Sequence, residues 1–201
     1  MLRCIDPFSC EALVFGSPTQ YENWLIRRFD PLVVYVDSSR DRWEVLNHGQ
    51  QLSISPHLHW AGWTDRGVLE MVIEPGREVS SAVVEAVTVV ARAHGLTASL
   101  RLAADIRSDP DLLNLLDRMR QKLVCHIDIV RDASVRGQVL AAVSAKPNCT
   151  RGDLIAGCSD SDPGLSPDAI DAVIFWLRRI GAVHFDFVGG RYDDRTTIRA
   201  A

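Results

Sequence analysis

Glu74 has a position that calls for a chemical explanation. This carboxylate ends the apolar run 68–73 and stands directly before a Pro-Gly stop. Burying an ionised carboxylate costs several kcal/mol unless the group is paired or binds a cation. Glu74 is therefore expected either in solvent at the end of a strand or within a site.

Two histidines and a second carboxylate could join Glu74 in a metal site. His57 and His59 stand two residues apart, and alternate residues of a strand share a face, which permits joint metal binding. Neither histidine has a cysteine or a third ligand beside it in the sequence, which argues against zinc. The simpler interpretation makes Glu22 a helix-capping residue and leaves His57 on the surface. It pairs Glu74 with Arg77 as an ordinary exposed ion pair.

The composition is that of an ordinary globular protein. Of 201 residues, 47% are hydrophobic and 24% are charged, and the net charge is −4. No apolar run approaches the roughly 18–20 residues of a membrane span, and the N-terminus lacks a signal-peptide pattern, so we expect a cytoplasmic protein with no membrane partner. Five cysteines without a CxxC pair favour reduced thiols. Neither half of the chain is rich in basic residues, so any contact with nucleic acid must come from a local patch.

The N-terminal part of the chain alternates between helix and strand patterns. Thr19 and Glu22 have the spacing of a capping box, and the apolar residues after them recur every three or four positions, which predicts a helix. Gly95 predicts the end of a second helix. This order predicts an α/β fold with a mixed central sheet flanked by helices. The expected elements are a helix at 19–30, strands at 32–36, 42–46, from 51 onward and at 68–73, a turn at 64–67, a helix at 79–94 and a strand at 96–102.

Clear caps mark the helices of the C-terminal part. Asp109 and Pro110 begin a helix that runs toward residue 124, and Ser166 and Pro167 begin one that runs to Gly181. Three helices followed by a hairpin predict a winged helix-turn-helix, and we therefore expect domains at 1–133 and 134–201. The three helices lie at 135–145, at 151–158 behind a Thr150 cap, and at 166–181, and the hairpin turns around Gly189-Gly190.

The order of these elements resembles the TnsA-type endonuclease subunit of heteromeric transposases. The likeness runs from about Tyr21 to the end of the chain. It rests on the helix with Glu22, the strand pair that ends in Ile73-Glu74, the helix and strand that follow, the leucine-rich helix 111–116 and the winged helix. The resemblance implies a restriction-endonuclease-like core of the PD-(D/E)xK fold, followed by a C-terminal winged helix domain.

The resemblance also implies a metal site, from which this chain departs. Family members place an Asp after a Pro at the end of one strand, and an acid or Gln, a spacer and a Lys at the end of the next. Here His57 follows the Pro, Glu74 fits the next ligand, and Gly76 stands at the Lys position. Glu22 matches the helix carboxylate, and Lys122 or Arg77 could replace the Lys.

These departures weaken the implied chemistry. The acids of the family hold Mg²⁺, which generates the hydroxide nucleophile and clamps the phosphate, and the Lys stabilises developing charge. The implied catalytic residues are Glu22, Glu74 and His57, with Glu74 and His57 as the metal ligands. No cofactor is expected unless the site is active, in which case it would need Mg²⁺ or, with a histidine ligand, Mn²⁺. Loss of the reaction is the favoured expectation.

Basic residues near the end of the chain are the candidate DNA contacts. Acidic residues at the start of the helix 166–181 would face phosphates, which disfavours standard major-groove docking. The basic groups lie instead at its far end and near the wing. Two interpretations therefore stay open: the wing contacts DNA phosphates, or the winged helix binds protein. These residues are Arg178, Arg179, Arg191 and Arg195.

The sequence therefore supports a leading hypothesis and two alternatives. The first is a catalytically degenerate TnsA-like protein that binds DNA or protein components of a transposition or mobile-element complex. The second is an active metal-dependent endonuclease with a rearranged site, built on Glu22, Glu74 and a nearby histidine or Asp65. The third is a winged-helix transcriptional regulator whose N-terminal domain dimerises or senses a ligand.

Overall fold

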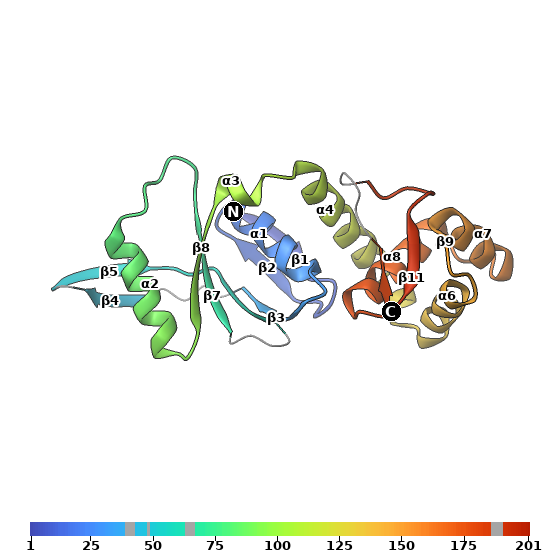
Figure 1. The fold of residues 1–201 in the computed structure, drawn as a ribbon, viewed down its shortest axis with the longest axis horizontal. Helices are drawn as coiled ribbons and strands as arrows, with labels where there is room; N and C mark the ends of the chain where they lie inside the picture. Colours follow the sequence, from blue (N-terminus) through green and yellow to red (C-terminus); the bar gives the residue numbers. More distant parts are fainter. Residues whose placement is uncertain (39–42, 48, 63–66, 186–190) are drawn as a thin grey trace. The chain divides into compact units, whose positions relative to one another are not determined.

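The computed structural model shows a mixed α/β protein with a mixed central sheet, as the sequence predicts (Figure 1). It describes residues 1–38, 43–47, 49–62, 67–185 and 191–201. No helix within these ranges is long and apolar enough to cross a membrane. The expected turn at 64–67, except for Gly67, and the Gly189-Gly190 turn lie outside the described residues, as does Asp65.

The chain divides into two compact units. Unit 1 contains Met1–Arg3 and Leu13–Ser108, and unit 2 contains Cys4–Ala12 and Asp109–Ala201. The division after Ser108 differs from the boundary expected at residue 133, because the helix that begins at Pro110 packs against the C-terminal helix of unit 2. The short strands β1 (Leu2–Ile5) and β2 (Ala12–Phe15) pair with each other.

Unit 1 is built on a four-stranded sheet of order β3-β6-β7-β8. The first two pairings are antiparallel, and β7 and β8 are parallel, so the helix α2 forms the crossover between them. A separate hairpin, β4-β5, lies between β3 and β6 in the sequence. The elements are α1 (Pro18–Phe29), β3 (Val33–Asp37), β4 (Trp43–Asn47), β5 (Gln50–Ile54), β6 (Leu58–Gly62), β7 (Val68–Ile73), α2 (Ser81–Ala93), β8 (Thr97–Leu102) and α3 (Ala103–Ile106).

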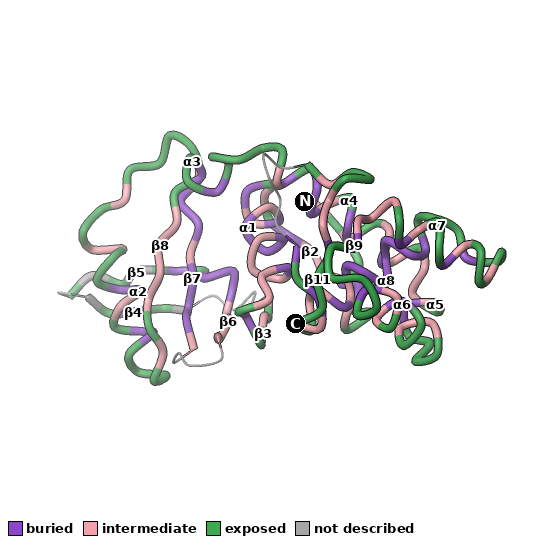
Figure 2. Tube along the Cα trace, turned by 45° about the vertical axis from the view of Figure 1, so that its right-hand side comes forward, coloured by how far each residue is buried: buried purple, intermediate pink, exposed green. Residues whose placement is uncertain are grey.

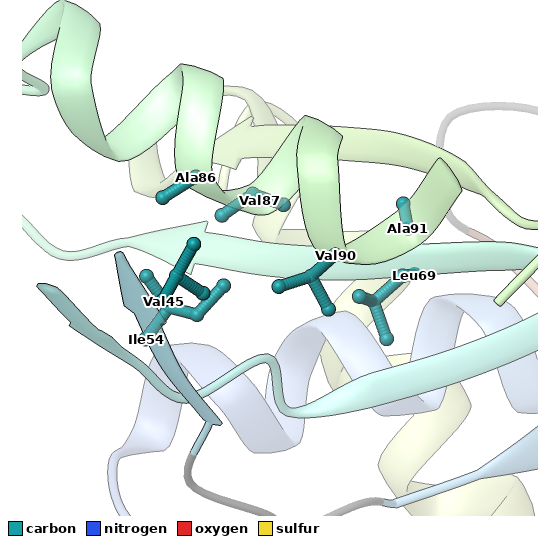
Figure 3. Packing of buried hydrophobic residues seen from close by; sticks show 7 residues of the cluster. All are labelled: Val45, Ile54, Leu69, Ala86, Val87, Val90 and Ala91. Atoms are coloured by element: carbon teal, nitrogen blue, oxygen red, sulfur yellow. The ribbon is translucent and has the colours of Figure 1, made fainter. Parts of the chain in front are cut away.

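One face of this sheet is apolar and packs under α2 (Figure 3). Leu69 of β7 is buried there among alanine and valine side chains of α2, together with Val45 and Ile54 from the β4-β5 hairpin. Neighbouring residues of a strand point to opposite faces, so Glu70 points away from α2. Its side chain bonds to residues of α1, which places α1 and α2 on opposite faces. We call these the α1 face and the α2 face.

The start of α1 differs from its predicted cap. Ser17 is the N-cap, and its side chain accepts the Gln20 N–H, whereas Thr19 lies inside the first turn. The chain can enter the helix earlier because Pro18 tolerates the first helical position, where its missing N–H leaves no bond unmade. Glu22 therefore forms no capping box. The apolar stripe is confirmed, since Tyr21, Trp24, Leu25 and Phe29 are all buried.

Unit 2 contains five helices among its described residues and a small sheet of order β10-β11-β9. The caps at Asp109, Thr150 and Ser166 are confirmed, and Thr150 forms a full capping box with Asp153. Both pairings of the sheet are antiparallel. The elements are α4 (Pro110–Cys125), α5 (Ile127–Arg131), α6 (Ala133–Ala145), β9 (Cys149–Thr150), α7 (Arg151–Ser161), α8 (Pro167–Arg179), β10 (Val183–His184) and β11 (Thr197–Ala200).

The helix α8 is the core of unit 2 (Figure 2). Every residue from 169 to 175 is at most 1% exposed, so side chains on all sides of the helix are covered. Its neighbours are α4, α5, α6, α7 and β10. A helix that is apolar and buried all round is a core element rather than a surface element.

Candidate functional site

A buried carboxylate, Glu70, is the centre of the α1 face. Its side chain is 0% exposed and accepts hydrogen bonds at both oxygens. Asn23 donates to Oε1 at 2.6 Å. Arg27 donates through Nη2 to Oε2 at 2.7 Å and through Nε to Oε1 at 3.3 Å. Trp60 Nε1 and Ser99 Oγ complete the set, at 3.3 and 3.1 Å from Oε2.

Regular secondary structure brings these side chains together. Asn23 and Arg27 stand four residues apart on α1, so they lie on one side of the helix. The parallel register places Ser99 of β8 beside Glu70, and Arg101 beside Val72. Ser99 and Arg101 therefore share the α1 face, where Arg101 Nη1 donates to Asn23 Oδ1 at 2.7 Å.

The network holds Glu70 in its charged form. Burial alone would raise the pKa of Glu70, but the bonds and charge of Arg27, with help from Asn23 and Arg101, outweigh burial and hold the pKa below its usual value. The Arg27 guanidinium also lies 4.4 Å from the centre of the Trp60 ring, a cation–π arrangement. Glu70 and Arg27 thus form a buried ion pair in which both carboxylate oxygens accept hydrogen bonds.

His57 joins the same network and is not the surface side chain of the simpler interpretation. It is 6% exposed, its Nδ1 accepts the Val72 N–H at 3.3 Å, and its Nε2 lies 3.2 Å from Asn23 Nδ2. Burial lowers the pKa of His57 to about 4, although the charges of Glu70 and Glu74 act in the opposite direction. An imidazolium has no acceptor nitrogen, whereas Nδ1 of His57 accepts the Val72 N–H. His57 is therefore neutral at physiological pH.

The two predicted carboxylates lie in a second network at the ends of β7 and β8. Glu74 accepts hydrogen bonds from the hydroxyls of Ser17 and Thr19, the latter at 2.9 Å. Arg107 pairs with Glu22 at 2.6 Å and also donates to Thr19 Oγ1 at 2.9 Å, so Glu22 and Glu74 belong to one chain of hydrogen bonds. Glu74 and Arg107 line a cavity of about 370 Å³.

These residues do not fit a magnesium or manganese site. Both oxygens of Glu70 and of Glu74 already accept protein hydrogen bonds, and Glu22 is paired with Arg107. Within the described ranges, no three His, Cys, Asp or Glu side chains gather as metal ligands. Of the proposed substitutes for the missing Lys, Arg77 lines the cavity beside Glu74, whereas Lys122 belongs to unit 2.

Unit 2 holds a second buried carboxylate, Asp171 of α8, which is also 0% exposed. Arg151 donates to both of its oxygens at 2.8 Å, and Tyr192 donates its hydroxyl at 3.0 Å. Lys122 contacts Asp171 and also Asp168, the latter at 2.8 Å. Arg151 makes a further pair with an aspartate, Asp194.

Two of the four candidate DNA-binding arginines stack on aromatic rings. The Arg178 guanidinium lies 5.2 Å from the Phe185 ring centre, and that of Arg179 lies 5.7 Å from the Phe8 ring centre. Phe8 in turn lies against Trp176, with ring centres 5.3 Å apart. Arg191 and Arg195 are exposed. The sequence prediction that these four arginines contact DNA stays a prediction.

Glu70, the centre of the α1 face, is not among the site residues predicted from the sequence. Glu70 interrupts the apolar run 68–73, and a charged residue within such a run is itself a signal of a buried, paired group. The Asn23 and Arg27 spacing on a helix, and the Ser99 and Arg101 spacing on a strand, were available as partners. What the sequence could not give is the register that brings them together.

Comparison of the chain with known protein families, curated proteins and solved structures finds no match.

Proposed function

We propose that this protein is a non-cutting, TnsA-like component of a mobile-element system. In this proposal unit 1 is a nuclease-like domain that serves as a scaffold, and unit 2 is a winged helix used in assembly with DNA or protein components. The observation that carries the proposal is the buried Arg27–Glu70 pair on the α1 face. Arg27 supplies the positive charge beside Glu70, and the implied metal ligands Glu74 and His57 are likewise bonded to protein groups.

The arrangement of unit 1 supports the nuclease-like interpretation. Apart from the β4-β5 hairpin inserted between β3 and β6, the series α1, β3, β6, β7, α2, β8 is a helix, three antiparallel strands, a crossover helix and a parallel strand. This agrees with the order of elements on which the resemblance to the TnsA-type endonucleases rests. Glu22, Glu74 and His57 all lie near the start of α1 or the strands it covers, but each is already bonded to protein groups.

The arrangement of unit 2 supports a winged helix that does not read bases with its third helix. The series α6, β9, α7, α8, β10, β11 and the sheet order β10-β11-β9 are those expected of three helices and a wing. A recognition helix inserts exposed side chains into the major groove, and α8 buries every residue from 169 to 175. This favours assembly over the function of a sequence-reading regulator.

Nicking of supercoiled plasmid in Mg²⁺ and, separately, in Mn²⁺ tests the proposal. We expect the wild-type chain to cut no faster than the Glu74→Ala variant, with folding of both checked by circular dichroism. Cutting by the wild type that the substitution abolishes would establish the active-endonuclease alternative. Sequence-selective duplex binding in EDTA would instead establish the regulator.

A further inference from the structure

Arg101 differs from the other cations of the α1 face in how its charge is matched. Arg27 pairs directly with Glu70, whereas Arg101, among the described residues, donates its side-chain hydrogen bond to an amide oxygen, Asn23 Oδ1. Glu70 and Asp105 act on Arg101 through their charges without bonding to it. A partly buried guanidinium that bonds to a neutral group retains donors for an anion.

The charge balance of the α1 face points the same way. Among the described residues of this face, Arg27 and Arg101 are cations, Glu70 is the buried carboxylate and His57 is neutral, while the exposed Asp105 acts on Arg101 through its charge. Burial and the nearby charge of Arg27 both lower the pKa of Arg101, which means that its cationic form is held at a cost. An anion bound at Arg101 would favour the cationic form and so oppose both effects.

We propose that Arg101, held by Asn23 beside the Arg27–Glu70 pair, binds an oxyanion of the phosphate type. The planar fork of a guanidinium matches two oxygens of such a group, and the partly buried position strengthens the contact. The source of the oxyanion is a nucleic-acid backbone or a free phosphate compound, which share this chemistry. The inference rests on the proposed function, in which no metal binds at this site. The α1 face would then bind an anion and would not catalyse cleavage.

Thermal unfolding of the full chain, compared in phosphate and in chloride at matched ionic strength, tests this proposal. The wild type should show a saturable rise of the unfolding midpoint of about 2–5 °C in phosphate beyond that of Arg101→Gln. Phosphate also stabilises proteins by exclusion from their surfaces, and the variant subtracts that general effect. Arg92→Gln, an exposed arginine of α2, is the matched control and should behave as the wild type.

A second arm identifies the source. Binding of a labelled duplex is measured in EDTA, for the wild type and Arg101→Gln. A loss of affinity of about fivefold or more in the variant assigns the site to the nucleic-acid backbone. Equal affinities, together with the Arg101-dependent phosphate effect, assign it to a free phosphate compound.

Equal phosphate responses of the wild type and Arg101→Gln would overturn the inference. That result is separable from failure of the proposed function, because metal-dependent nicking would reject the scaffold while the phosphate comparison, made without metal, would still be readable. Arg101→Lys, which keeps the charge but not the fork, should retain only part of the midpoint rise.

Discussion

Glu70 in unit 1 and Asp171 in unit 2 are two solutions to the same problem. Each carboxylate is 0% exposed, each is held by an arginine, and each takes a further bond from an aromatic residue, Trp60 or Tyr192. They differ in what surrounds the arginine. Asp171 has a second direct cation, Lys122, and its cations also contact other aspartates.

This difference separates a structural network from a candidate binding site. Around Asp171, Arg151 and Lys122 each contact two carboxylates, so carboxylates of the protein balance the charge of both cations. Around Glu70, hydrogen bonds link Arg101 to the carboxylate through the side chain of Asn23, and Glu70 otherwise acts on Arg101 by charge alone. Among the described residues, Arg101 of unit 1 therefore bonds to an amide oxygen and to no carboxylate, whereas Arg151 and Lys122 of unit 2 each contact two carboxylates.

Arg27→Met should produce the largest loss of stability. It leaves Glu70 buried without a bonded cation, a change that typically costs about 3–5 kcal/mol of unfolding free energy. Chemical denaturation of the full chain measures the loss, with Arg92→Met as the matched control on the exposed side of α2. A loss below about 1 kcal/mol would mean that Glu70 does not depend on Arg27.

Arg151→Met should cost less than Arg27→Met. Asp171 keeps Lys122 as a direct partner and Tyr192 as a donor, so we expect a loss of about 1–3 kcal/mol. The same denaturation measurement decides the order of the two variants. If Arg151→Met is the more damaging substitution, the contrast between the two networks is wrong.

The slope of stability against pH tests the neutral state of His57. Its pKa is about 4 in the folded chain and 6.5 when unfolded, so between these values the unfolded chain binds a proton that the folded chain does not. Stability should fall as the pH is lowered from 7 to 5, by about 2 kcal/mol from this residue. Glu70 contributes below that window, because its pKa is lowered from 4.5.

His57→Gln should flatten this slope, and His184→Gln, an exposed histidine of unit 2, should leave it unchanged. Denaturation midpoints at several pH values make the comparison. An unchanged slope in His57→Gln would show that the imidazole is protonated without penalty.

Glu22→Gln should have the smallest effect. Its pair with Arg107 is partly exposed on both sides, and exposed pairs are worth about 0–1 kcal/mol. Thermal unfolding of this variant should match the wild type within a few degrees. A large loss would give Glu22 a structural role that its contacts do not indicate.

Local sequence signals predicted the long helices well. The features that were not predicted depend on contacts between segments that are distant in the sequence. The caps at Asp109, Thr150 and Ser166 were predictable because the capping side chain and the helix it caps are neighbours in the sequence. The cap of α1 was misplaced by two residues, since Ser17 and Thr19 are both competent caps and only the position of Pro18 distinguishes them.

The candidate site was only partly predictable for the same reason. His57 and Glu74 were selected for their types, and the structure does place them near α1. Glu70 was not selected because its apolar neighbours are typical of a buried strand without a functional polar residue. Its meaning depends on the register of β7 with β8 and on which side of α1 covers the sheet, and neither is encoded within one segment.

A titration of the wild-type chain with Mn²⁺, followed by calorimetry and by the signal of the free ion in electron paramagnetic resonance, tests the central claim most directly. If Arg27 already matches the charge of Glu70, we expect no stoichiometric Mn²⁺ site, and the same weak background binding of Mn²⁺ in Glu70→Gln. One tightly bound ion per chain that Glu70→Gln or Glu74→Ala removes would contradict it.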